Sequence, residues 1–214
     1  MSQVFFISGI DTNIGKSYAT GFLAAEWASA GKKVITQKMI QTGNKDVAED
    51  IVFHRKMMGI EFLPEDNEKL TMPEIFTYPA SPHLAAKIDN RAIDFDKIEK
   101  ATEILREKYE IVLIEGAGGL MVPLTEDLLI IDYIAQKNFP VILVTSARLG
   151  SINHTLLSFE AIERRGIKLH SVVYNLFDEN FDKVISEDTF RFIKKQMSAR
   201  FPDAKLITLS AIDV

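Results

Sequence analysis

Short apolar segments alternate with segments of helical periodicity along most of the chain, and this alternation most constrains the fold. Residues 4–7, 111–114 and 141–144 are apolar throughout and rich in β-forming types, which is typical of strands buried on both faces. Between such segments, apolar residues recur three or four positions apart, as in residues 16–30. Strands of this kind separated by helices predict an α/β fold, with a mainly parallel β-sheet flanked by helices on both faces.

The same patterns locate the individual elements. We expect strands over residues 3–8, 33–38, 111–114, 141–144 and 169–174 and near 206–207, and helices over residues 16–30, 46–58, 95–108, 128–137, 151–165 and within 186–198. Residues 60–92 are rich in Pro, Asn and charge, and predict a long loop with one short helix near 83–87. No repeat or linker interrupts the chain, so we predict a single domain over residues 1–214.

Composition excludes several classes of protein. The net charge of -5 argues against a general binder of nucleic acid or of membrane surfaces. There are no cysteines, which removes disulfides, thiolate metal sites and thiol nucleophiles. No apolar run approaches the roughly 20 residues that span a bilayer, and no basic leader precedes the first strand. We therefore expect a cytoplasmic protein with neither nucleic-acid nor membrane partners.

A glycine-bearing loop joins the first predicted strand to the first predicted helix. Residues 8–17 read SGIDTNIGKS, and the ending Gly15-Lys16-Ser17 resembles the close of a phosphate-binding P-loop, although the usual spacing would place a glycine at Ile10. In this setting the backbone amides of residues 12–17 would surround a phosphate at a helix N-terminus. The Lys16 ammonium would reach the outer phosphates, and the Ser17 hydroxyl would ligate Mg²⁺.

Two charged residues stand at the ends of predicted strands. Glu115 follows the apolar strand 111–114, as an acidic residue does in a Walker B strand, and would face the phosphate loop and share in holding Mg²⁺. The alternative is a carboxylate that caps a turn. Lys38 ends the second strand, where a lysine is costly unless it meets solvent or an anion. From the residues alone, its catalytic role stays open.

Taken together, these segments resemble the dethiobiotin synthetase family. Residues 9–17 fit its loop G-x-D-T-x-x-G-K-[ST] at every fixed position, which explains the displaced glycine. Five further segments match motifs of the family. Residues 38–43 match K-P-V-x-S/T-G, with Met39 in place of the proline, and residues 79–83 match P-x-S-P-H. Residues 115–119 match E-G-A-G-G, residues 140–144 match P-V-I-L-V, and residues 149–154 match L-G-x-I-N-H. The resemblance covers about residues 3–175. It implies a P-loop NTPase-like fold.

The resemblance also implies a reaction. Dethiobiotin synthetases join 7,8-diaminopelargonate and CO₂ (from bicarbonate) to give dethiobiotin in biotin synthesis, with ATP as co-substrate and Mg²⁺ as cofactor. The path runs through a carbamate and a carbamic-phosphoric mixed anhydride. By position, Lys16, Lys38 and Thr12 would be catalytic, and Ser17, Asp50 and Glu115 would hold Mg²⁺. Asp46 competes with Asp50 for that role, although counting back from the helix end at Gly59 favours Asp50.

Binding roles are carried over in the same way. The implied nucleotide-binding residues are Asp11, Thr12, Asn13, Ile14, Gly15, Lys16, Ser17, Glu115, Gly116 and Asn175. The implied substrate-binding residues are Lys38, Thr42, Ser81, Gly118, Gly119, Leu149, Gly150 and Asn153. In the family the last three belong to the neighbouring subunit, which implies a homodimer with shared active sites. Their alternative role is a simple helix start. The four histidines lack metal-like spacing, and we assign none to zinc.

The resemblance weakens after Asn175. The G-x-[IL]-P-type loop and further helical segment that usually close over the base are not recognisable, so we expect weak adenine recognition and loose nucleotide choice. Two rival classes share the phosphate loop. A partitioning-type ATPase scaffold usually has an additional lysine near the start of the loop, where this chain has residues 8–11. A small-molecule kinase would not need the motifs at residues 81–83 and 116–119.

Overall fold

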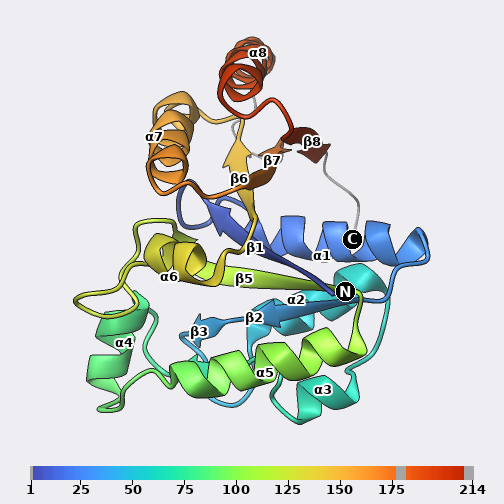
Figure 1. Cartoon of the computed structure of the whole chain (residues 1–214), viewed down its shortest axis with the longest axis vertical. Coiled ribbons are helices and arrows are strands. Elements are labelled where there is room, and N and C mark those ends of the chain that lie inside the picture. Colours follow the sequence, from blue (N-terminus) through green and yellow to red (C-terminus); the bar gives the residue numbers. More distant parts are fainter. Residues whose placement is uncertain (1, 177–181, 210–214) are drawn as a thin grey trace.

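The main structural element is a six-stranded parallel sheet. The computed structural model describes residues 2–176 and 182–209. The strand order in the sheet is β2-β5-β1-β6-β7-β8 (Figure 1). The strands are β1 (Gln3–Gly9), β2 (Val34–Lys38), β5 (Ile111–Gly119), β6 (Val141–Ser146), β7 (Leu169–Asn175) and β8 (Lys205–Leu209). The predicted α/β fold with a mainly parallel sheet is confirmed.

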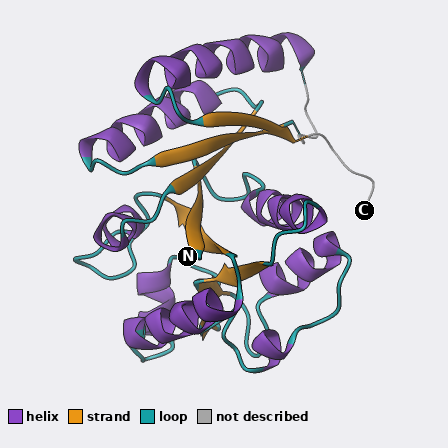
Figure 2. Ribbon diagram, turned by 45° about the vertical axis from the view of Figure 1, so that its right-hand side comes forward, coloured by secondary structure: helices purple, strands orange, loops and turns teal. Residues whose placement is uncertain are grey.

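Helices flank the sheet on both faces (Figure 2). The long ones are α1 (Lys16–Ser29), α2 (Glu49–Met58), α5 (Phe95–Lys108), α6 (Ile130–Lys137), α7 (Ser151–Arg164) and α8 (Lys183–Arg200). Helix α5 begins at the Asp94 side chain, which accepts the Lys97 amide hydrogen, and its bounds are those expected from periodicity. Helix α2 begins three residues later than expected. None of the helices in the described part of the chain is both long and apolar enough to cross a bilayer.

Residues 60–92 are more regular than their composition suggests. They contain α3 (Pro64–Asn67), β4 (Glu74–Phe76) and α4 (Pro82–Ile88), and β4 pairs in parallel with β3 (Ile40–Thr42) in a separate small sheet. The prediction of a long loop with one helix was therefore wrong for β4 and α3. Three-residue strands carry too little periodicity to be recognised from sequence.

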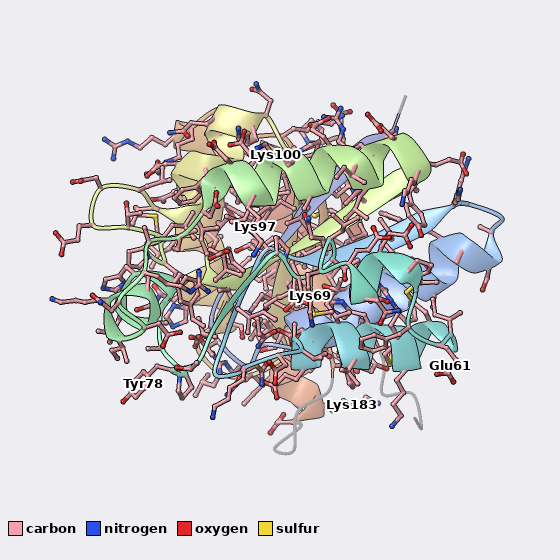
Figure 3. The ribbon with its side chains drawn as sticks, turned by 90° about the horizontal axis from the view of Figure 1, so that it is seen from below. Glu61, Lys69, Tyr78, Lys97, Lys100 and Lys183 are labelled. Carbon is pink, nitrogen blue, oxygen red and sulfur yellow. The ribbon has the colours of Figure 1, made fainter. Side chains whose placement is uncertain are left out.

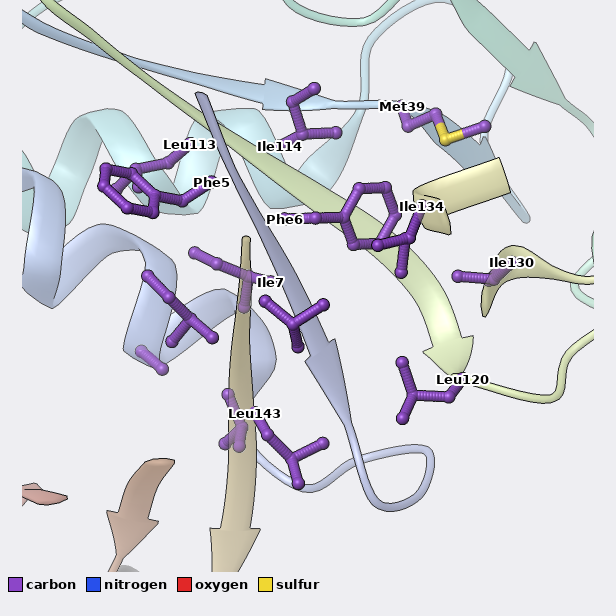
Figure 4. Close-up of a cluster of buried hydrophobic side chains, with 14 of the residues drawn as sticks. Phe5, Phe6, Ile7, Met39, Leu113, Ile114, Leu120, Ile130, Ile134 and Leu143 are labelled. Carbon is purple, nitrogen blue, oxygen red and sulfur yellow. The ribbon is translucent and has the colours of Figure 1, made fainter. Parts of the chain in front are cut away.

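The core lies between the sheet and its covering helices. Phe6 and Ile7 of β1 are fully buried, and Figure 4 shows the Phe6 ring beside Ile134 of α6. Full burial of an apolar side chain of this size is worth about 1.5–3 kcal/mol. By contrast, Glu61 and Tyr78 lie at the periphery of the molecule (Figure 3). The rigid centre of the sheet is thus formed by β1 and its neighbours.

The strand register places charged residues side by side at the carboxyl edge of this centre. In the β2–β5 pairing Lys38 lies opposite Glu115, and in the β1–β5 pairing Ile7 lies opposite Glu115. The loop that follows β1 therefore begins at the edge of the sheet where Lys38 and Glu115 lie. This edge is where open α/β sheets bind ligands.

Candidate active site

A cavity of about 1210 Å³ opens at the carboxyl ends of β1, β2 and β5. Most residues that the sequence nominated line it: Thr12, Asn13, Gly15, Lys16, Ser17, Lys38, Thr42, Asp50, Ser81, Glu115, Gly118 and Asn175. These residues come from segments that lie far apart in the sequence, and the order of the strands in the sheet brings them together. The cavity is large enough for a nucleotide together with a small substrate.

The loop after β1 is tightly turned. Asn13 and Gly15 have positive φ angles of 56° and 92°. A Cβ on Gly15 would lie 2.3 Å from Asn175 Nδ2, and a Cβ on Gly9 would lie 2.5 Å from the side chain of Ile14. Neither position has room for a side chain, so both glycines are required. Gly9 takes the place of the glycine that the usual P-loop spacing would put at position 10.

Asp11 organises the start of this loop. Its carboxylate accepts the Thr12 amide hydrogen at 2.7 Å and pairs with Arg148, which follows β6. The Thr12 amide and Arg148 hold the pKa of Asp11 below its usual value. In this structure the Thr12 amide therefore faces Asp11, whereas the sequence suggested that it would face a phosphate.

Lys16 is buried beside the loop with little compensation for its charge. Its side chain is 7% exposed and donates to the Asp11 carbonyl oxygen at 3.3 Å. Burial, and next the neighbouring Lys38 ammonium, lower the pKa of Lys16. An anion bound in the cavity would relieve both effects, so this position favours binding of a phosphate.

Lys38, Asp50, Glu115 and Ser17 form a compact ionic cluster. Lys38 Nζ lies 2.6 Å from Asp50 Oδ2 and 2.8 Å from Glu115 Oε1, and donates to the Gly116 carbonyl oxygen at 3.2 Å. The Ser17 hydroxyl lies 2.5 Å from Asp50 Oδ1 and 3.0 Å from Glu115 Oε1. Two carboxylates thus share one cation, here an ammonium, and the Ser17 hydroxyl bonds to both of them.

The donor set of this cluster fits Mg²⁺. A hydroxyl and two carboxylates are the hard oxygen ligands that this ion prefers, and it keeps waters and phosphate oxygens for its other positions. Burial would lower the pKa of Lys38, but Glu115 and Asp50 raise it above its usual value. Burial would raise the pKa of Glu115, but Lys38 and a His54 hydrogen bond hold it well below its usual value. Lys38 and Glu115 are therefore both charged at neutral pH.

The predicted substrate residues divide into two groups. Thr42 and Ser81 line the cavity, and the Ser81 hydroxyl lies 3.0 Å from His83 Nδ1. Gly118, with φ of 80°, also lines it. Gly119 has a packing role instead, as does Gly116 of the predicted nucleotide-binding set. A Cβ on Gly116 would lie 2.7 Å from the Phe6 ring, and a Cβ on Gly119 would lie 3.1 Å from the Gly9 carbonyl oxygen.

Other nominated residues lie outside the cavity lining. These are Asp11 and Ile14 in the loop, and Leu149, Gly150 and Asn153 at the start of α7. Leu149 is 84% exposed, so an apolar side chain lies on the surface just before this helix. Asp46 is exposed and offers its backbone carbonyl to Lys69, whereas Asp50 lies within the ionic cluster. The geometry therefore favours Asp50 of the two candidates.

Two residues of the site were missed from the sequence. His54 lies 2.8 Å from Glu115 Oε2, and Arg148 pairs with Asp11. His54 follows Asp50 by four residues, so both lie on the same face of α2, and this spacing could have suggested a shared environment. Among the predicted nucleotide-binding residues, Asn175 donates to the Ile14 carbonyl oxygen at 3.1 Å. The segment that would follow it, residues 177–181, lies outside the described residues, as do residues 210–214.

A parallel α/β sheet, a loop with lysine and serine at a helix start, and an acidic residue in the adjacent strand define a P-loop NTPase-type protein. Residues 3–201 match a family model described as AAA domain. A solved ParA family ATPase from Chlorobium tepidum superposes with a TM-score of 0.54, covering 98% of this chain and 86% of that chain at 15% identity. That likeness shows the fold alone.

Curated sequence relatives are more specific. ATP-dependent dethiobiotin synthetase BioD 2 of Pasteurella multocida is 50% identical over 214 residues, all of this chain and all of the relative. The protein of the same name from Haemophilus influenzae is 56% identical over 179 residues, which cover 84% of this chain and 94% of that one. The chain belongs to the dethiobiotin synthetase family.

Proposed function

We propose that this protein is an ATP-dependent dethiobiotin synthetase. It would convert 7,8-diaminopelargonate, CO₂ and ATP into dethiobiotin, ADP and phosphate. The observation that carries the proposal is the convergence of Lys16 and Ser17 with Lys38, Asp50 and Glu115 in one cavity. The chain that forms this cavity is 50% identical to one named synthetase along its full length. Such a site joins a phosphate-binding loop to cations that can stabilise a second anion.

The chemistry follows from what these side chains can do. One amine of the substrate adds to CO₂, loses a proton and gives a carbamate. A carbamate oxygen then attacks the γ-phosphorus of ATP, ADP leaves, and a mixed anhydride forms. The second amine attacks the carbonyl carbon and releases phosphate, which closes the ureido ring. Lys16 would neutralise the transferred phosphoryl group, and Thr12 would donate a hydrogen bond to the γ-phosphate. Lys38 would hold the carbamate oxygens, with Thr42, Ser81 and Gly118 around them.

Mg²⁺ would be held by Ser17, Asp50 and Glu115 and would supply positive charge next to the phosphates. Binding of this ion requires Lys38 to share or leave its two carboxylates, which lie 2.6 and 2.8 Å from its ammonium. A released Lys38 would carry its charge toward the substrate side of the cavity. The two lysines therefore have separate roles, with Lys16 at the phosphates and Lys38 at the carbamate.

We further propose a cytoplasmic homodimer with shared active sites. The start of α7 supports this, because Leu149 is exposed and Asn153 lies outside the cavity of its own chain. In a partner's site, the N-terminus of this helix would meet the distal carboxylate of the substrate. The loose nucleotide choice expected from the sequence also remains part of the proposal.

One incubation separates the proposed function from its rivals. The protein is mixed with 7,8-diaminopelargonate, ¹³C-bicarbonate, Mg²⁺ and ATP, and the products are analysed by mass spectrometry. We expect dethiobiotin that carries the label, and none when ATP is omitted. Release of ADP without a labelled product would favour a partitioning-type ATPase. A phosphorylated, unlabelled substrate would favour a small-molecule kinase.

A further inference from the structure

The two oxygens of the Glu115 carboxylate have separate partners. Oε1 lies within the ionic cluster, 2.8 Å from Lys38 Nζ and 3.0 Å from Ser17 Oγ. Oε2 points to the other side and lies 2.8 Å from His54 Nε2. His54 is fully buried and lies one helical turn after Asp50 in α2. The same helix thus carries a proposed metal ligand and a residue that contacts a second one.

A chain of hydrogen bonds continues behind the histidine. His54 Nδ1 lies 3.1 Å from the Thr36 hydroxyl oxygen, and Arg55 Nη1 donates to the same oxygen at 2.9 Å. The Arg55 guanidinium is held in turn by a bidentate pair with Asp66, at 2.8 Å for both bonds. All four of these residues are buried. Because each group is fixed by the next, the imidazole ring has a defined orientation.

The chemistry of the groups sets the direction of these bonds. A guanidinium only donates, so the Thr36 oxygen accepts from Arg55 and its own hydrogen is available for His54 Nδ1. A carboxylate only accepts, so His54 Nε2 carries the hydrogen that faces Glu115. A hydrogen on Nε2 and an acceptor at Nδ1 satisfy every partner in the chain. Each link then supplies one donor to the next, which strengthens the neighbouring bonds.

We propose that His54 is a positioning residue for the metal site. Its Nε2–H bond fixes the rotation of the Glu115 carboxylate, so that Oε1 faces Ser17 and Asp50, where Mg²⁺ of the proposed reaction binds. This inference rests on the proposed function. Partners that orient a ligating carboxylate change metal affinity by about 10- to 100-fold when they are removed. A histidine that only filled space would be replaceable by an apolar residue of similar size.

The test measures metal affinity rather than turnover. Mn²⁺ binding to the full-length protein with a non-hydrolysable ATP analogue is titrated by electron paramagnetic resonance. We expect His54→Leu to weaken Mn²⁺ binding by about 10-fold or more, and His54→Gln, which keeps an N–H near the place of Nε2, to stay within about threefold of the parent. His170→Leu is the matched control, since His170 packs against Phe5 and Trp27 away from the site.

Each result decides the question. Unchanged Mn²⁺ affinity in His54→Leu, or an equal loss in His54→Leu and His54→Gln, would overturn the inference while leaving the proposed function intact. Failure of the parent protein to bind Mn²⁺ with nucleotide would remove both. If His54→Leu does not fold, Thr36→Val and Thr36→Ser replace it: we expect only the valine, which lacks the hydroxyl that orients the ring, to weaken binding. Equal affinities in that pair would likewise overturn the inference.

Discussion

Lys16 and Lys38 are both buried lysines in one cavity, yet their removal should have opposite consequences for stability. Lys38 is 5% exposed and is the cation for two carboxylates, of which Glu115 is fully buried. Replacing Lys38 by methionine leaves these carboxylates facing each other across Ser17. Breaking a buried ion pair by removing one partner costs about 3–5 kcal/mol, and the partial exposure of Asp50 favours the lower end of that range.

Lys16 has no such role in the absence of a ligand. Burial and the Lys38 charge lower its pKa, and its ammonium donates to a backbone carbonyl oxygen. Replacing it by methionine keeps most of the packing and removes a repulsion. We expect the free energy of unfolding of Lys16→Met to stay within about 1 kcal/mol of the parent, or to rise. Both variants should lose turnover, so activity alone cannot distinguish the two lysines.

Urea denaturation at pH 7, without nucleotide or Mg²⁺ and at one fixed protein concentration, measures the difference. A loss of about 3 kcal/mol in Lys38→Met corresponds to a fall in Tm of about 6–12 °C for a chain of this size. Adding Mg²⁺ should restore part of it, because the ion replaces the missing charge. Equal stabilities of the two variants, or a less stable Lys16→Met, would refute the assignment of Lys38 as the counter-ion of the cluster.

Three further predictions follow from individual contacts. Gly15→Ala should weaken ATP binding by about 10-fold or more, because it forces a side chain into a positive-φ position 2.3 Å from Asn175 Nδ2. Isothermal titration calorimetry with an ATP analogue checks this, and an affinity equal to that of the parent would contradict it. Asp50→Asn should weaken Mn²⁺ binding by about 10-fold or more while Asp46→Asn leaves it unchanged, and the reverse order would return the metal role to Asp46. Asp66→Asn should destabilise the protein at neutral pH, and the difference from the parent should shrink on acidification. The Arg55 and Thr71 hydrogen bonds overcome burial and hold the pKa of Asp66 below its usual value, so its contribution is present above the usual pKa of an aspartate and is lost as the pH falls through the lowered one. A constant difference in the free energy of unfolding between pH 7 and pH 2 would argue against the pairing.

Much of the site could be predicted from the sequence because its parts are local patterns. The loop before α1 combines an apolar strand, glycines and a helix start within 15 residues, and each signal is readable without knowledge of the rest of the fold. Lys38 and Glu115 each stand at the end of a strand predicted from the sequence, and parallel strands end at the same edge. Their partnership with each other depends on β2 and β5 being neighbours, which no local pattern states.

The remaining features depend on the tertiary arrangement. His54 looks like an ordinary helix residue until α2 packs against β2 and buries it next to Glu115. Arg148 and Asp11 lie 137 positions apart, and only the adjacency of β1 and β6 brings them together. The strands β3 and β4 have three residues each, too few for a period to be recognised. Buried polar partners and short elements are thus where sequence reasoning is weakest.

The central claim is that a triphosphate binds in the loop after β1, with a divalent cation beside it at Ser17, Asp50 and Glu115. A crystal structure of the protein grown with Mg²⁺ and a non-hydrolysable ATP analogue tests it most directly. The account predicts that density for the phosphates follows the backbone of residues 13–17 and that a metal ion contacts these three side chains. A loop that is empty and closed at saturating nucleotide, with Lys38 still bound to both carboxylates, would contradict it.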